Sequence, residues 1–169
     1  MDEIRMSPVD WALRPLRRYA DFRGRAPRAE YWWYALMIAV VGGLLGGTDM
    51  LLLHGRIYGD YGALGFAFTI AVVIPGFAVL VRRLHDSDNS GWWAVLHIPG
   101  VALILAGHSP IHSSEVLKGV PAPLHAYVSI AWALVSLTLL VFTVLRGTEG
   151  PNRYGPDPYG PTDLEEVFA

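Results

Sequence analysis

The stretch Gly62–Val81 reads GALGFAFTIAVVIPGFAVLV and contains no charged residue. An α-helix needs about 20 apolar residues to cross the roughly 30 Å hydrocarbon core of a bilayer, and this stretch has that length. An amphipathic helix of a soluble protein carries a polar stripe at helical spacing, which this stretch lacks. The stretch therefore predicts a transmembrane helix, and with it a membrane protein.

Three further apolar stretches accompany this one. They cover residues 31–53, 92–107 and 126–145. The last contains no charge, and in the first Asp49 falls near the far end. The stretch 92–107 is short and contains the break Pro99-Gly100, so a re-entrant hairpin is the alternative to a full span there.

Basic residues are distributed unevenly between these stretches. Arginines precede the first stretch, separate the second from the third and follow the fourth, whereas the other two connections hold only Arg56 and Lys118. Cytoplasmic segments of membrane proteins are enriched in Lys and Arg. Four spans place the arginine-rich segments on one side, whereas a re-entrant third stretch would move Arg146 and Arg153 to the other. The sequence predicts an all-α membrane protein of four transmembrane helices, with both termini cytoplasmic.

A short amphipathic segment, residues 8–22, precedes the first span. Its apolar residues recur at three- and four-residue spacing. They are Val9, Leu13, Leu16 and Ala20. This pattern indicates a helix lying in the headgroup layer, although Pro15 would bend or break it. An irregular basic tail is the alternative.

At 169 residues the chain is long enough for one domain. We predict a single four-helix membrane domain over residues 1–158 and a cytoplasmic tail over 159–169. The segment after the fourth stretch is rich in Pro and Gly, which predicts turns rather than a long helix.

Three motifs flank the predicted spans. They read FRGRAPRAEYWW (Phe22–Trp33), VRRLHDSDNSGWW (Val81–Trp93) and GPNRYGPDP (Gly150–Pro158). Together they resemble the signature of the domain of unknown function 805 family, the YhaH-like bacterial inner-membrane proteins, from about Trp11 to Pro158. The resemblance implies a four-helix protein of the bacterial inner (plasma) membrane. It implies no activity, so no catalytic residue is carried over from it.

All three motifs are predicted at the cytoplasmic face, where arginines could converge beside interfacial tryptophans. A guanidinium binds phosphate or carboxylate in two-point geometry. We interpret this face as a surface for an anionic lipid headgroup or a protein partner. The candidate residues are Arg23, Arg25, Arg28, Arg82, Arg83, His85, Asp86, Trp92, Trp93 and Arg153. In the alternative interpretation, these arginines pair with Glu30, Asp86, Asp88 and Asp157 for structural reasons.

The pair His85-Asp86 is typical of a general base with an orienting carboxylate, and it makes a membrane enzyme one alternative function. Adjacent helical residues point about 100° apart, however, so the two do not easily bond each other. Arg82 and Asp86, four residues apart, would share a helix face. The enzyme hypothesis therefore ranks last, and no catalytic residue is predicted.

Two Pro-Gly breaks support another alternative, a small oligomeric transporter or channel. Pro75 and Pro99 cannot donate to the carbonyls of Ala71 and Val95. Freed carbonyls at membrane depth line binding sites in transporters, unless neighbouring helices supply donors. His97 is the one ionisable residue inside its stretch and is an intramembrane candidate. Close packing, within one chain or in a homo-oligomer, is favoured by small residues on the first span. They are Gly42, Gly43, Gly46 and Gly47.

Composition excludes several classes of function. A net charge of −2 argues against nucleic-acid binding. The chain has no cysteine, so it has no thiolate ligand or thiol nucleophile. We predict no cofactor and no metal site. The histidines of the opposite face, His54, His108, His112 and His125, offer ligand spacing only at His108 and His112, where Pro110 intervenes.

Overall fold

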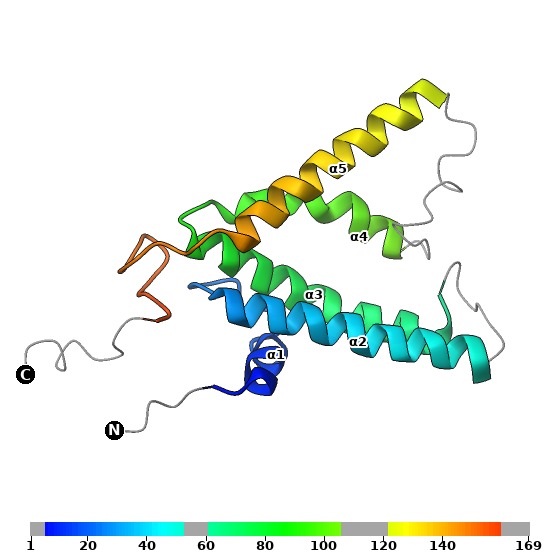
Figure 1. Cartoon of the computed structure of the whole chain (residues 1–169), viewed down its shortest axis with the longest axis horizontal. Helices are drawn as coiled ribbons and strands as arrows, with labels where there is room; N and C mark the ends of the chain where they lie inside the picture. Colours follow the sequence, from blue (N-terminus) through cyan, green and yellow to red (C-terminus); the bar gives the residue numbers. More distant parts are fainter. Residues whose placement is uncertain (1–5, 53–60, 106–121, 160–169) are drawn as a thin grey trace, which may run out of the picture.

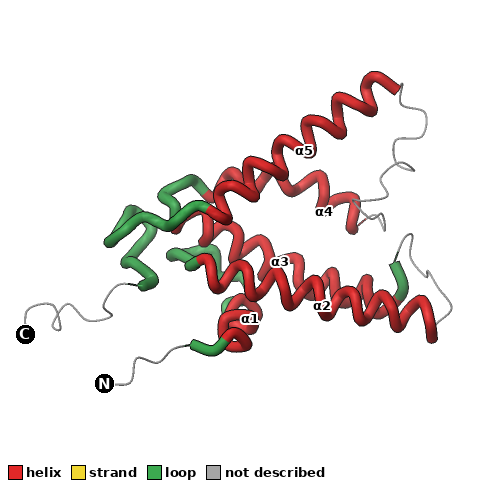
Figure 2. Tube along the Cα trace, in the orientation of Figure 1, coloured by secondary structure: helices red, strands yellow, loops and turns green. Residues whose placement is uncertain are grey.

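Every regular element in the described part of the chain is a helix. The computed structural model describes residues 6–52, 61–105 and 122–159. Its helices are α1 (Pro8–Arg17), α2 (Arg28–Leu52), α3 (Ala63–Asp86), the 3₁₀ helix η1 (Gly91–His97), α4 (Ile98–Leu105) and α5 (Ala122–Val144). Figure 2 shows loops and turns between them and no strand within these ranges. The predicted all-α fold is confirmed for these residues.

Several helices meet at one end of the molecule. In Figure 1, α2 begins, α3 ends, η1 begins and α5 ends at the left of the view. The segments 22–28, 82–93 and 146–159 lie there, and we call this end the motif end. α1 lies beneath α2 and is seen nearly end-on, and it packs against both α2 and α3.

α2 and α3 are long and apolar enough to cross a membrane. Only 6% of the most apolar part of α2 and 28% of that of α3 is buried. The core helix of a soluble protein would be mostly buried, so this surface requires an apolar surrounding. Along α2 the exposed side chains include Leu36, Val40 and Leu44.

α3 continues beyond the predicted end of the second stretch at Val81. It runs on to Asp86, so Arg82 and Arg83 are helical residues and lie in no loop. Both arginines and Asp86 are buried. Their partners, described below, allow the helix to carry charge into the protein interior.

The third apolar stretch, expected as one helix over 92–107, is divided into η1 and α4 at His97. Pro99 cannot donate to the carbonyl of Val95, and the N–H of Ile98 donates to it in the 3₁₀ manner. Pro99 then lies in the first turn of α4, where a missing N–H leaves no carbonyl unpaired. The Pro-Gly break therefore marks a change of helix type. Residues 106 and 107 lie outside those described.

Pro75 leaves no open carbonyl beside it in α3. Pro75 has no N–H to donate to the carbonyl of Ala71. That carbonyl accepts a hydrogen bond from the Tyr19 hydroxyl at 2.9 Å instead. One residue later, the carbonyl of Val72 accepts from the Tyr34 hydroxyl at 3.0 Å. Hydroxyl donors from neighbouring segments thus pair with both carbonyls, which was one of the two alternatives expected from the sequence.

α1 is shorter than the predicted segment 8–22. It starts with a capping box in which the Asp10 N–H donates to Ser7 Oγ at 3.1 Å and the Ser7 N–H donates back to Asp10 at 3.3 Å. The hydrogen bonds with Ser7 hold the pKa of Asp10 below its usual range. The helix ends at Arg17, soon after the buried Pro15. Ala20 therefore lies beyond the helix, and Val9 is exposed.

The glycines of α2 are not all packed within the chain. A Cβ at Gly42 would lie 3.6 Å from the ring of Phe68 on α3. At Gly43, Gly46 and Gly47 a Cβ would meet no atom within 4 Å among the residues described. Within the described residues, packing inside one chain, the simpler expectation, therefore accounts for Gly42 but not for the other three glycines.

Asp49 on α2 caps the start of α3. Its two carboxylate oxygens accept from the N–H groups of Leu64 at 3.1 Å and Gly65 at 2.7 Å. The N-cap residue itself is Gly62, which has no side chain to do this. A Cβ at Gly62 would collide with the Asp49 side chain. A carboxylate from the neighbouring helix thus replaces the local cap and faces the positive helix end.

The Asp49→Ala substitution should destabilise the protein, because it removes both acceptors. We expect the free energy of unfolding to fall by about 1–2 kcal/mol, the upper part of the range for a lost cap. Thermal unfolding in detergent, followed by circular dichroism, measures this. Thr48→Ala is the control, because among the described contacts the Thr48 hydroxyl bonds the Leu44 carbonyl of its own helix. Equal stability of the two variants would contradict the capping role.

Candidate functional site

Asp86, in the last turn of α3, is the centre of a buried charge cluster at the motif end. Its Oδ1 accepts from Arg25 Nε at 3.0 Å, and its Oδ2 pairs with Nη1 of Arg83. The three side chains are at most 4% exposed. A carboxylate this deeply buried requires charged and hydrogen-bonding partners. Two guanidinium groups provide them.

Arg83 also caps the C-terminal end of α5. Its Nε donates to the carbonyl of Thr143 at 3.1 Å, and its Nη2 donates to the carbonyl of Leu145. The last carbonyls of a helix lack donors within the helix, and a cation suits that negative end. A Cβ at Gly147 would collide with the Asp86 carboxylate. Glycine at this position therefore allows the chain leaving α5 to pass the cluster.

The segment 146–159 folds over the end of α3 in turns, as its Gly and Pro content predicts. Arg25 donates through Nη1 to the carbonyl of Gly150 at 2.6 Å and through Nη2 to that of Thr148 at 2.5 Å. The N–H of Thr148 donates to the carbonyl of Asp86 at 2.9 Å. These contacts join the first and third motifs to the second. Residues 160–169 of the predicted tail lie outside those described.

His85 is held from three directions. Its Nδ1 lies 3.1 Å from the carbonyl oxygen of Gly24, and its ring stacks on Tyr154 with centroids 3.8 Å apart. Its own carbonyl accepts from the Asn152 side chain at 2.9 Å. Within the described residues its ring makes no hydrogen bond to Asp86, as expected for helical neighbours. These contacts give His85 a positioning role between the motifs.

Arg82 belongs to a separate buried pair. Its Nη2 bonds Glu30 Oε1 at 2.7 Å, and Glu30 Oε2 lies 3.5 Å from Nε of Arg14 on α1. Both Arg82 and Glu30 are fully buried. Arg82 and Asp86 are four residues apart on α3, but within the described residues they do not pair, because Arg83 binds Asp86 and Glu30 of α2 binds Arg82. These pairs agree with the alternative interpretation, in which the arginines pair with acidic residues for structural reasons.

Two hollows on the surface meet at the exposed residue Arg28. The first has a volume of about 400 Å³ and is lined by Arg25, Arg28, Asp86, Arg146, Gly147, Thr148, Glu149, Asp157 and Tyr159. The second is a shallow groove of about 360 Å³ lined by Arg28, Ala29, Trp32, Trp33 and Leu36. Arg28 makes no hydrogen bond or ion pair within residues 6–52, 61–105 and 122–159. Within these ranges its charge therefore borders both hollows and forms no ion pair with the carboxylates that line the first.

The acidic groups of the first hollow already have partners. Asp157 accepts from the N–H of Tyr159 at 2.9 Å and of Gly150 at 3.0 Å, and these bonds hold the pKa of Asp157 below its usual range. Glu149 pairs with Arg146 at 3.0 Å, with both side chains exposed. An exposed pair of this kind is weak, so Arg146 can exchange Glu149 for another anion.

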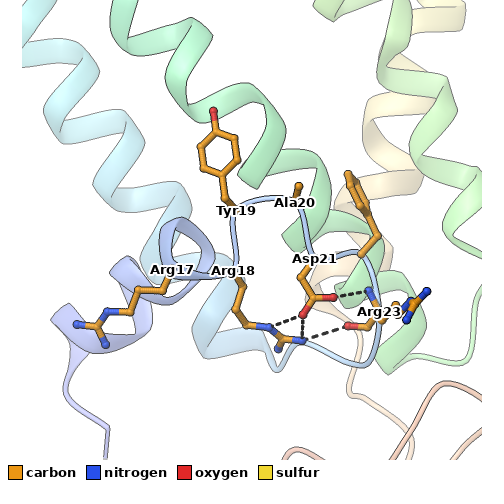
Figure 3. Close-up of a pocket in the computed structure, with 7 residues that line it drawn as sticks. Arg17, Arg18, Tyr19, Ala20, Asp21 and Arg23 are labelled. Atoms are coloured by element: carbon orange, nitrogen blue, oxygen red, sulfur yellow. Dashed lines mark hydrogen bonds and ion pairs between the residues drawn. The ribbon is translucent and has the colours of Figure 1, made fainter.

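A third hollow lies on the turn after α1 and does not gather its arginines around one point. Figure 3 shows Arg17 directed away from Arg18 and Asp21. Arg18 binds the Asp21 carboxylate through Nε at 2.9 Å and Nη2 at 2.6 Å, which lowers the pKa of Asp21. The same carboxylate accepts from the N–H of Arg23 at 3.0 Å. This turn is satisfied internally and is not arranged around an anion.

The other predicted site residues are spread over the motif end and beyond it. Arg23, Trp92 and Trp93 are exposed, and Arg153 forms an exposed pair with Asp88 at 3.1 Å. His97 lies on η1 and lines an apolar cavity that shares no residue with the hollows at Arg28.

The motifs that meet here occur in a known protein family. A model of the family described as "Protein of unknown function (DUF805)" matches residues 19–156. The chain belongs to the DUF805 family. No solved structure gives a significant match to it.

Three relatives from Escherichia coli (strain K12) indicate what kind of family this is. The chain is 34% identical to inner membrane protein YhaI over 146 residues, covering 86% of this chain and 92% of YhaI. It is 43% identical to inner membrane protein YhaH over 90 residues, covering 53% and 74%. It is 31% identical to uncharacterized protein YiiR over 143 residues, covering 79% and 83%. By the names of these relatives, the DUF805 family is one of inner-membrane proteins without an assigned function.

Four residues that contact the charge cluster or His85 were not singled out from the sequence. Thr148 and Gly147 lie just before the third DUF805 motif, and Asn152 and Tyr154 lie inside it. The third motif could have indicated Asn152 and Tyr154, because both lie inside it. In the whole described part of the chain, no group of three His, Cys, Asp or Glu residues could hold a metal ion. His54, His108 and His112 lie outside the described residues, as does the side chain of His125.

Asp86→Asn should release the segment after α5, because it leaves Arg25 and Arg83 buried without a counter-ion. Removing one partner of a buried ion pair costs about 3–5 kcal/mol. We expect a lower unfolding free energy and faster proteolysis beyond residue 145, read by mass spectrometry of the fragments.

Asp88→Asn is the matched control. Asp88 is 47% exposed in its pair with Arg153, and a surface pair contributes about 0–1 kcal/mol. Similar proteolysis rates for the two variants would show that Asp86 does not hold the cluster.

Proposed function

We propose that the chain is an inner-membrane protein with four transmembrane segments, formed by α2, α3, η1 with α4, and α5. The names of the relatives, the exposed apolar surface of α2 and α3, and the meeting of helix ends in Figure 1 support this. The arginines of the connecting segments gather at the motif end, which the positive-inside rule assigns to the cytoplasm. In this orientation α1 lies along the headgroup layer.

The motif end, in this proposal, binds an anionic phospholipid through Arg28. The observation that carries it is that Arg28 lines both a polar hollow and a tryptophan groove. A phospholipid presents groups in the same order, a phosphate followed by apolar chains. The Arg28 guanidinium can bind the phosphate in two-point geometry. Trp32 and Trp33 are residues typical of the bilayer interface, and Leu36 continues the groove toward the acyl chains.

The geometry changes which arginines serve this function. Arg82 and Arg83, both candidates from the sequence, are fully buried against Glu30 and Asp86. They support the fold and do not face a ligand. Arg28 supplies the accessible charge, and the polar hollow places Arg146 beside it.

Each of the two alternative functions loses one of the observations that suggested it. The carbonyl of Ala71, freed by Pro75, accepts from Tyr19, and that of Val95 accepts from Ile98. A transporter that coordinates cargo through these carbonyls therefore has no support. Among the described contacts His85 is engaged through its Nδ1 and one ring face, which weakens the case for a general base. Lipid binding is the function that the geometry supports best.

Arg28→Gln should reduce the preference for anionic lipid. One Arg near a charged surface contributes about 1 kcal/mol, which corresponds to roughly a fivefold loss of affinity. Native mass spectrometry of the protein from mixed nanodiscs, comparing retained phosphatidylglycerol with phosphatidylcholine, measures the preference. The double variant Arg28→Gln with Arg146→Gln should lose more.

The control is Arg17→Gln, on an exposed arginine of α1 that lines neither hollow. Because Arg17 lies 3.8 Å from the Asp10 carboxylate and borders no headgroup hollow, its variant should lose less of the preference than the Arg28 variant does. If the Arg28 and Arg17 variants retain phosphatidylglycerol equally well, the headgroup proposal is wrong and a protein partner becomes the better explanation of this face.

A further inference from the structure

Both Pro-Gly breaks of the chain face one apolar cavity. Gly76 from the break in α3 and Gly100 from the break in α4 line a cavity of about 340 Å³, together with side chains of α2 and α5. Figure 1 shows α4 and α5 diverging from α2 and α3 with distance from the motif end. The cavity falls within the range of roughly 300–1,000 Å³ that is usual for small-molecule sites.

Three helices contribute an aromatic ring to the walls of this cavity. Tyr31, Phe77 and Trp132 contribute rings from α2, α3 and α5. A Cβ at Gly100 would lie 2.8 Å from the Trp132 ring, so glycine at this position lets that ring approach α4. A Cβ at Gly76 would meet only Tyr34, at 3.9 Å, and would otherwise point into free space. Aromatic side chains favour stacked or edge-on contacts with another planar ring.

His97 is a polar group of the cavity with unused hydrogen-bonding capacity. It is half-buried, and its ring centroid lies 6.3 Å from that of Trp132. Within the described parts of the chain it has no hydrogen-bond partner. Of the other polar side chains that line the cavity, Thr69 already donates its hydroxyl to the carbonyl of Gly65, and Tyr31 offers a second hydroxyl. An imidazole without a partner in apolar surroundings is costly, so an acceptor on a ligand would be favourable here.

Among the described residues, no acidic or basic side chain other than His97 lines the cavity, so a charged ligand would find no counter-ion among them. We propose that it binds a neutral, ring-bearing molecule from the lipid phase. A ring carbonyl of this molecule accepts a hydrogen bond from His97, and its ring lies against Trp132 and Phe77. The proposal is independent of the headgroup proposal, because the two sites share no residue.

The test uses the full-length protein in phosphatidylcholine nanodiscs and decylubiquinone as the probe. Labelling with 5-fluorotryptophan places a ¹⁹F reporter on each of the six tryptophans, and Trp132→Phe assigns the Trp132 resonance. Decylubiquinone should shift this resonance saturably and leave the interfacial tryptophans almost unchanged. Decylbenzene, which has the ring and tail but no carbonyl, should bind much more weakly.

Three variants separate the cavity from unspecific partition into the bilayer. Gly76→Leu fills the cavity and should abolish the saturable shift. Gly43→Leu is the matched control on an open face of α2 and should bind as wild type. His97→Phe should weaken binding about fivefold, the equivalent of one neutral hydrogen bond.

A shift spread equally over all tryptophans, or wild-type binding by Gly76→Leu, would overturn the site. Wild-type binding by His97→Phe, or equal binding of decylbenzene, would overturn the assigned hydrogen bond.

Discussion

The guanidinium groups of Arg25 and Arg83 share one buried carboxylate, that of Asp86. The hydrogen-bond acceptors that these two groups require determine much of the structure of the motif end. Taking charges out of water costs several kcal/mol per ion, unless hydrogen bonds and counter-charges offset it. One carboxylate cannot satisfy two guanidinium groups, so the remaining N–H groups need other acceptors. Carbonyl oxygens at the end of α5 and in the segment after it supply them. The cluster thereby joins segments that are distant in the sequence.

The same demand explains why arginine occupies these positions. Arg83 donates in three directions at once, to Thr143, Asp86 and Leu145. A planar guanidinium with five N–H groups can do this, whereas an ammonium concentrates its donors at one point. In the sequence alone, such arginines indicate membrane topology. In the folded protein several of them are structural, and the proposal of lipid binding uses the exposed Arg28.

The sequence indicated the long helices well because a helix surrounded by lipid must be apolar on all sides. The ranges 31–53, 62–81 and 126–145 therefore correspond closely to α2, α3 and α5. It could not indicate that the third stretch begins as a 3₁₀ helix, because a Pro-Gly break is compatible with a kink, a hairpin or a change of helix type. The family resemblance, confirmed by the match over residues 19–156, identified the three motifs that meet at the motif end.

The pairing inside the site was harder to predict for a physical reason. Arg82 and Arg83 both lie within one turn of Asp86, and local spacing cannot choose between them. The choice depends on Glu30 of α2, which draws Arg82 away. The contacts of Thr148 and Gly150 are made through their backbone carbonyls, so no residue type marks them. Only the packing of distant segments reveals such bonds.

The span of chain between Arg25 and Thr148, 123 residues, also orders events during biogenesis. Arg25 therefore leaves the ribosome before its carbonyl acceptors do. If its guanidinium were buried without those acceptors, N–H groups would be left unpaired, which is costly. The charge cluster can therefore form completely only after the chain has been translated and inserted through α5.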